Sequence, residues 1–327
     1  MKKSRFLFVL ILFAFISASA FSVSSDFGLA LEPYFKINNG YVGEYLFNLE
    51  GTGKIVHYAP EGSKQISQLD WDVSSLKIFG NKIYLRYKDF QVRNTLEVGI
   101  PATSGQMKDY DWNSMVGYHT HFSCHENELT KYFSGDLLLG WKIDSGEENF
   151  SVTPLVGFDF NRIGFVARNG YTQYVTDSNS VWSDELEKNL VYGDITTYRQ
   201  DRWLLKLGFE SVFSVKPKFD IKADLFFCPV LNLNSYDSHL RKTPSSDYLD
   251  YHMRKAFAID GEVSFEYSAK ENLSFVLSVN GSYQTVATGD SYGKYSTDTA
   301  YGKINNSKGG ANQWMIGTSL GVRYNFF

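Results

Sequence analysis

Hydrophobic and polar residues alternate with a period of two along most of the chain. In the run from Phe219 to Leu225, Phe, Ile, Ala and Leu share one face, while Asp, Lys and Asp share the other. Residues 273–280 and 82–87 repeat this pattern. An α-helix would scatter these apolar residues around its axis, whereas an extended strand places them all on one side. The pattern therefore predicts β-strands, each with one polar and one apolar face.

Ten such strands are predicted, and their connections alternate in length. The approximate spans of the strands are 28–49, 63–79, 81–99, 126–143, 150–174, 197–215, 218–234, 251–268, 271–287 and 312–327. Short polar turns lie near 79–81, 144–149, 215–218 and 269–272, and long loops lie near 99–125, 175–197, 235–250 and 287–311. Strict alternation of this kind between an even number of strands is typical of outer-membrane barrels. A soluble β-sandwich gives no reason to sort its loops by length.

The fold class that follows is all-β: a ten-stranded antiparallel transmembrane β-barrel with long extracellular loops and short periplasmic turns. Several predicted strands exceed the roughly 9–11 residues that cross a bilayer, so the barrel should project above the membrane. Aromatic residues make up 17% of the chain and only 7 residues are Pro, which suits strands with one wet face. No linker divides residues 21–327, so we expect a single barrel domain.

The first twenty residues have the pattern of an export signal. Three of the first five residues are basic, residues 6–16 are apolar, and Ala18-Ser19-Ala20 gives the small-x-small pattern that signal peptidase cuts. A membrane anchor is the alternative, but the apolar run is short and lacks the flanks of a stop-transfer helix. Removal of this signal peptide, residues 1–20, lowers the formal net charge from −4 to −7. This acidic balance gives no reason to expect nucleic-acid binding.

Two short motifs carry side chains that could perform chemistry. Asp109 and Asp111 form a D-x-D pair after the third predicted strand, and Asp237 and His239 form a D-x-H pair after the seventh. With a periplasmic N-terminus both connections are external, so both pairs lie at one end of the barrel, on opposite walls. Asp237 would orient His239, which would take a proton from a water molecule held by the two aspartates. Because neighbouring carboxylates repel, the aspartates would share a proton near neutral pH.

Each motif alone also has a simpler interpretation. A D-x-D pair in a loop is more often a solvated turn or a weak cation site, and a histidine on a polar loop is usually just hydrated. Catalysis is favoured by a set of motifs that occur in order: Ser67-Gln68-Leu69-Asp70-Trp71, Asp109-Tyr110-Asp111-Trp112, Ser123-Cys124-His125, the run 164–170, Asp237-Ser238-His239 and the run 321–326. In order and spacing this set resembles the omptin family of ten-stranded outer-membrane endopeptidases.

The resemblance implies catalytic roles for the residues of both motifs, Asp109, Asp111, Asp237 and His239. It also implies that Ser123 and His125 are supporting residues of the active-site groove, and that the reaction uses no metal or organic cofactor. Two alternatives are a serine nucleophile at Ser123 and a cysteine nucleophile at Cys124. Only His125 is an obvious adjacent base for either, so we rank both below an activated water molecule. Cys124 and Cys228 are the two cysteines of the chain, and we expect no disulfide between them.

The resemblance is weaker in the specificity pocket and on the outer surface. Omptins cut beside basic residues by means of acidic groups, but counting without gaps puts Lys54 and Ser235 at those positions. A lysine would repel an arginine side chain, so cleavage beside basic residues is in doubt. The family also needs lipopolysaccharide on the barrel's outer surface, as an activator. Arg162 matches an arginine that contacts this lipid, although an ion pair with Asp159 is the alternative.

Three hypotheses follow for function. The first is an outer-membrane endopeptidase that cuts exposed peptides or proteins outside the cell. The second is a barrel without catalysis, acting as an adhesin or a structural protein. The third is a small channel, which we disfavour because ten strands enclose a narrow lumen. Charged residues such as Asp220, Lys222 and Asp224 would face that lumen and pair across it.

Overall fold

The computed structural model describes residues 26–327, except 114, 145, 148, 178 and 179. The predicted signal peptide lies outside the described residues. Among the described residues, no helix is long and apolar enough to cross a membrane. This part of the chain consists mainly of β-strands, as the alternating pattern predicts.

Fourteen strand segments form over the described residues. They are β1 (Phe27–Asn48), β2 (Lys64–Tyr87), β3 (Phe90–Gly99), β4 (Ala102–Trp112), β5 (His119–Trp141), β6 (Ile143–Asp144), β7 (Phe150–Tyr174), β8 (Asn189–Leu190), β9 (Asp194–Lys216), β10 (Phe219–His239), β11 (Ser246–Arg254), β12 (Phe257–Lys270), β13 (Leu273–Tyr295) and β14 (Gly302–Asn325). β3 and β4 form one long strand, since both pair with β2 and β5. β11 and β12 form another between β10 and β13. β6 and β8 are two-residue additions to β7.

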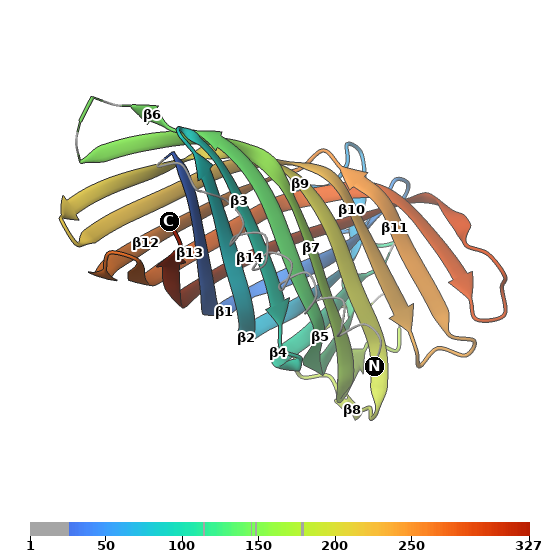
Figure 1. Cartoon of the computed structure of the whole chain (residues 1–327). Coiled ribbons are helices and arrows are strands. Elements are labelled where there is room, and N and C mark those ends of the chain that lie inside the picture. Colours follow the sequence, from blue (N-terminus) through green and yellow to red (C-terminus); the bar gives the residue numbers. More distant parts are fainter. Residues whose placement is uncertain (1–25, 114, 145, 148, 178–179) are drawn as a thin grey trace.

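The resulting ten-stranded sheet closes on itself. Each long strand pairs antiparallel with the next, and β1 pairs antiparallel with β14, from Ala30 opposite Asn325 to Asn48 opposite Ser307. Figure 1 shows the tilted strands wrapped around a common axis. Closure pairs the backbone groups that an open sheet edge would leave exposed. The ten-stranded antiparallel barrel predicted from the sequence is confirmed.

The turn predicted at residues 79–81 is wrong. β2 continues to Tyr87, and the chain turns beyond it at Lys88, whose φ is 53°. Gly80 is a strand residue opposite Tyr34 of β1, and a Cβ at this glycine would lie 2.2 Å from the Tyr34 ring. The glycine therefore makes room for an aromatic side chain instead of bending the chain.

Most of the predicted long loops are also shorter than expected. β4 extends to Trp112, β10 to His239 and β13 to Tyr295, well into segments predicted as loops. The alternating pattern fades there because polar residues occur on both faces of these strands, as with Lys108 and Asp109 on β4. The described residues between β7 and β9, which are 175–177 and 180–193, keep a largely irregular path. The two candidate motifs therefore lie on strands, not in loops.

The outer face of the barrel divides into two zones. An apolar band of exposed side chains surrounds the part next to the short turns; examples are Phe79, Val98, Leu137, Phe158, Leu207, Leu225, Val263, Leu277 and Leu320. On the loop side of this band, exposed outward residues become polar, as with Glu126 and Lys131 on β5. A bilayer matches the apolar band. We call the strand ends beyond it the rim, and they lie outside the membrane-spanning segments.

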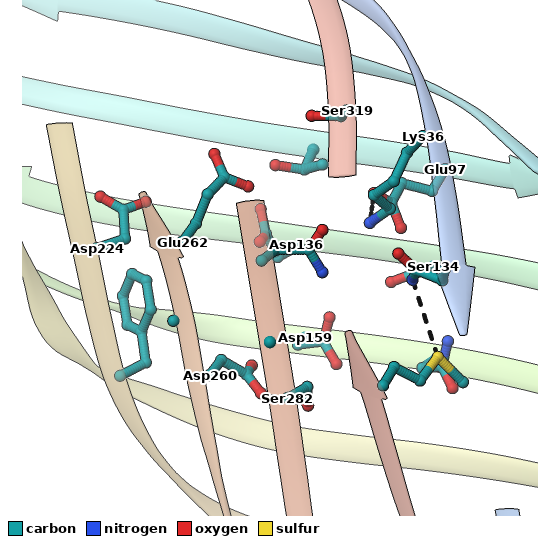
Figure 2. A pocket seen from close by; sticks show the side chains of 18 of the residues that line it. Lys36, Glu97, Ser134, Asp136, Asp159, Asp224, Asp260, Glu262, Ser282 and Ser319 are labelled. Atoms are coloured by element: carbon teal, nitrogen blue, oxygen red, sulfur yellow. Dashed lines mark hydrogen bonds and ion pairs between the residues drawn. The ribbon is translucent and has the colours of Figure 1, made fainter. Parts of the chain in front are cut away.

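Ion pairs fill much of the lumen within the apolar band. Lys222 lies 2.6 Å from Glu266, and Arg93 lies 2.6 Å from Asp224. A cavity of about 150 Å³ remains among such groups. Figure 2 shows Asp136, Asp159 and Asp260 pointing into it from β5, β7 and β12. Charged groups predicted to face the lumen thus do pair there, with partners far away in the sequence.

Candidate active site

The two candidate motifs face each other inside the rim. Asp109 and Asp111 lie near the end of β4, and Asp237 and His239 lie at the end of β10. The placement of these residues in loops was therefore wrong, although they do lie at one end of the barrel. Their electrostatic interactions link the two walls, because the charge of Asp237 acts on Asp109 and that of His239 acts on Asp111.

Asp237 and His239 form a directly bonded pair. The His239 Nε2 atom lies 2.5 Å from Asp237 Oδ2, and the Thr196 hydroxyl donates to Asp237 Oδ1 at 2.7 Å. Asp237 is buried, whereas the His239 side chain is 28% exposed. The edge of the imidazole meets the Tyr248 ring, with centroids 5.2 Å apart. Since Asp237 holds Nε2, the Nδ1 atom is the one left to exchange a proton with a bound molecule.

The two aspartates of β4 stand between strands β2 and β5. Asp109 is level with Leu69 and Ser123, while Asp111 is level with Ser67 and His121. Directly opposed residues in antiparallel strands share a face, so all these side chains point to the same side of the wall. Asp109 Oδ1 is buried and has no hydrogen-bond partner among the described residues. A ligand bound between the strands of the rim could supply that partner.

The aspartate pair holds its protons more tightly than isolated carboxyls do. Burial raises the pKa of Asp109 well above its ordinary range, and the charges of Asp111 and Asp237 raise it further. Burial also raises the pKa of Asp111, but a hydrogen bond from Ser67 and the nearby imidazoles counteract this. Asp109 is thus the group that keeps a proton when the pair holds one.

Two buried acids that the sequence did not single out lie beside the motifs. Glu44 of β1 is 8% exposed and Asp250 of β11 is 7% exposed. Burial raises the pKa of Glu44 well above its ordinary range, and the charges of Asp237, Asp250 and Asp109 add to this. Burial likewise raises the pKa of Asp250 to about 6. The signal available in the sequence was the spacing: Glu44 follows Val42 by two residues, so a strand places both side chains on the same face.

Ser123, which lies opposite Asp109, and His125 form a buried hydrogen-bonded pair on β5. His125 Nδ1 lies 2.5 Å from the carbonyl oxygen of Asn169, and Nε2 lies 3.0 Å from the Ser123 hydroxyl oxygen. Nδ1 therefore donates to the carbonyl, and Nε2 accepts from the serine. Burial lowers the pKa of His125, which favours this neutral form. Cys124 lies opposite Lys108 on the other face of β5, and both it and Cys228 are free thiols.

Lys54 and Ser235, the two predicted specificity residues, make different contacts. The Lys54 ammonium lies 4.8 Å from the centre of the Trp112 ring, and its side chain is exposed. Ser235 is buried and donates to Asp250 Oδ2 at 3.1 Å. The gapless count that put Lys54 in a specificity pocket crosses the irregular segment 49–63, so its place in such a pocket stays a prediction. Glu44 lies close enough to the motifs for the charges of Asp237 and Asp109 to raise its pKa.

Arg162 lies on the outer surface, but its partner is not Asp159. Two of its guanidinium nitrogens bind the carboxylate of Asp201 at 2.6 and 2.7 Å, and its side chain is 35% exposed. Asp159 instead points into the lumen, 3.7 Å from Arg202. A second outer arginine, Arg199, lies 3.4 Å from Asp201.

Comparison with known proteins decides the family. The family model described as the omptin family matches residues 42–326. The chain belongs to the omptin family. The plasminogen activator of Yersinia pestis is 24% identical over 246 residues, which cover 73% of each chain. Protease 7 of Escherichia coli K12 is 27% identical over 145 residues, or 41% of this chain and 43% of that protein.

The solved structures give a similar result for the fold. The crystal structure of the outer membrane protease OmpT from Escherichia coli superposes with a TM-score of 0.79 at 18% identity. The match covers 93% of this chain and 99% of that one. The resemblance to omptins drawn from the ordered motifs is confirmed. This omptin is therefore a β-barrel of a family of outer-membrane proteases.

Proposed function

We propose that this omptin is an endopeptidase that hydrolyses exposed peptides or proteins, with its active site on the extracellular side of the outer membrane. The observation that carries the proposal is the bonded Asp237–His239 pair facing the Asp109–Asp111 pair inside the rim. An imidazole and two carboxyls that interact across the rim suit the activation of a water molecule.

The proposed reaction uses these side chains and water, without a metal or an organic cofactor. His239 Nδ1 accepts a proton from water as the water oxygen attacks the peptide carbonyl carbon. Asp237 stabilises the imidazolium that forms. Protonated Asp109 can donate a hydrogen bond to the developing oxyanion, and Asp111 holds the attacking water. When the intermediate collapses, the C–N bond breaks and the departing amine takes the proton from His239.

Glu44 and Asp250 favour a basic side chain beside the cut, contrary to the doubt raised by Lys54 and Ser235. Both acids are buried next to the motifs, and burial raises the pKa of each. A guanidinium or ammonium group would favour their ionised forms and displace their protons. Binding of such a substrate should therefore strengthen as the pH rises above about 6.

Lipopolysaccharide is the proposed activator and the lipid partner. Arg162 and Arg199 flank one carboxylate, Asp201, so the cluster keeps one excess positive charge near the apolar band. Guanidinium groups bind phosphate through paired hydrogen bonds. A lipid phosphate would share these arginines with Asp201, which predicts weaker binding than two unpaired arginines would give.

A peptide library tests the proposal. The barrel would be refolded with and without lipopolysaccharide and given a mixed peptide library, alongside His239→Ala and Asp109→Asn. We expect cleavage by the wild-type protein, a loss of about 10²–10⁴-fold in each variant, and Arg or Lys beside the cut. No cleavage by any folded barrel would contradict the endopeptidase and favour an adhesin or structural role. Cleavage beside neutral residues would contradict only the acidic pocket.

A further inference from the structure

A second imidazole stands beside the aspartates, on the wall opposite His239. His121 of β5 lies directly across from Asp111 of β4, and Tyr174 of β7 lies directly across from His121. The three side chains therefore form a row on one face of adjacent strands. Neither the motifs nor the comparisons assign a role to His121.

His121 is held in a defined orientation. Its Nδ1 atom lies 2.8 Å from the hydroxyl oxygen of Thr120, which is itself buried. The ring meets Tyr174 edge-on, with centroids 4.5 Å apart and an interplanar angle of 63°. The Nε2 atom has no hydrogen-bond partner among the described residues, so it is the nitrogen available to bind a proton. A side chain held by two contacts is pre-organised for a function that depends on position.

Electrostatics connect this imidazole to the aspartate pair. A positive charge on His121 favours the ionised form of Asp111 and opposes the effect of burial on that carboxyl. Tyr174 responds to the same carboxylates, since burial and the charges of Asp109 and Asp111 raise its pKa to about 12. Asp111 on β4, His119 on β5 and Tyr174 on β7 are the titratable groups that interact with His121. The charged groups that act on the aspartates from the other elements are Asp237, His239 and Lys242.

We infer that His121 is a positioning residue for the proposed hydrolysis: its imidazole keeps Asp111 ionised, so that the shared proton stays on Asp109. The inference rests on the proposed function, in which Asp111 holds the attacking water and Asp109 donates to the oxyanion. A positive charge at His121 opposes the protonation of Asp111. His121 thereby extends activity to lower pH than the aspartate pair alone would allow.

The pH dependence of cleavage tests this role. In His121→Asn, the Asn side chain can still accept a bond from Thr120 but cannot carry the charge. We expect the acid limb of kcat/KM to move to higher pH by about one unit, with KM little changed. His121→Lys should restore the wild-type limb because it supplies a cation. His252→Asn is the matched control; it removes an exposed imidazole outside the site and should leave the limb in place.

If the acid limb of kcat/KM for His121→Asn coincides with that of the wild type, the inference is overturned. A merely structural role would reduce the folded fraction without moving the limb. A second measurement needs no activity: NMR titration of labelled histidines in Asp111→Asn. We expect the His121 signals to titrate at a pH lower by about one unit, while those of His252 stay unchanged. Unchanged His121 signals would overturn the inference even if the endopeptidase is active, and the expected change would support it even if no peptide is cut.

Discussion

At the scale of single residues, the site depends on acids whose surroundings differ. Asp237 accepts a hydrogen bond from Thr196 and orients the His239 imidazole. Asp109 lacks a partner for one oxygen and is ready to bind a ligand or a proton. Glu44 is similar, since its Oε2 atom is buried without a hydrogen-bond partner among the described residues. A buried carboxylate without a bonding partner lowers the stability of the fold when it ionises.

Asp250 gives a prediction about stability and pH. Its pKa is raised from 3.8 to about 6, chiefly by burial, so the folded barrel binds this proton more tightly than the unfolded chain. The resulting stabilisation is fully present below about pH 3.8 and is lost as the pH rises through about 6. The Asp250→Asn variant cannot ionise at this position, so it should not lose this stabilisation. Its free energy of unfolding, relative to that of the wild type, should therefore rise by on the order of 3 kcal/mol as the pH increases through this range.

Urea unfolding of both proteins in detergent micelles at pH 4, 5 and 7 would measure this difference. The hydrogen bonds of Ser235 and Ser291 to Asp250 can be kept in part by the amide, so the comparison at pH 4 serves as the baseline. A gap between the two proteins that is the same at pH 4 and pH 7 would contradict the assignment.

At the scale of elements, strand length and register bring the site together. β4 and β10 continue beyond the apolar band, and this extension carries both motifs into the rim. Register between β4 and β5 then sets Asp111 opposite His121 and Asp109 opposite Ser123. A shift of one residue in this pairing would turn every one of these side chains to the other face.

Gly80 tests the packing that keeps β1 and β2 in register. Gly80→Ala places a methyl group 2.2 Å from the Tyr34 ring, which must move, so we expect a loss of about 1–3 kcal/mol in the free energy of unfolding. Gly261→Ala on β12 is the control, because its nearest atom would lie 3.7 Å away. Urea titrations of both variants would give the comparison, and equal midpoints would show that β2 tolerates a side chain at this position.

At the scale of the whole molecule, the fold was predictable because residues that face the lipid and residues that face the lumen alternate along each strand of a membrane barrel. Alternation gave the strands, and the alternating connections gave the barrel. The rim strands were missed because polar residues occur on both of their faces, which obscures the alternation. Ion pairs in the lumen, such as Arg323 with Glu32, join residues 291 positions apart, so no local pattern could reveal them.

The site was predictable only in part, for a related reason. Asp109, Asp111, Asp237 and His239 stand out as short motifs. Strand register and barrel closure bring Glu44 and Asp250 beside the motifs. The pairing of β4 with β5 brings His121 beside Asp111. The prediction for Lys54 rests on counting along the sequence, and such a count does not follow the path of the irregular segment after β1.

The central claim, that the two motifs act together on one water molecule, is tested most directly by a double-mutant cycle. kcat/KM would be measured for wild type, Asp109→Asn, His239→Ala and the double variant, with Cys124→Ala as a control on the opposite face of β5. We expect each single change to cost about 10²–10⁴-fold, and the double variant to lose little more than the worse single one. Losses that multiply in the double variant would mean that the two motifs act independently and would contradict the account.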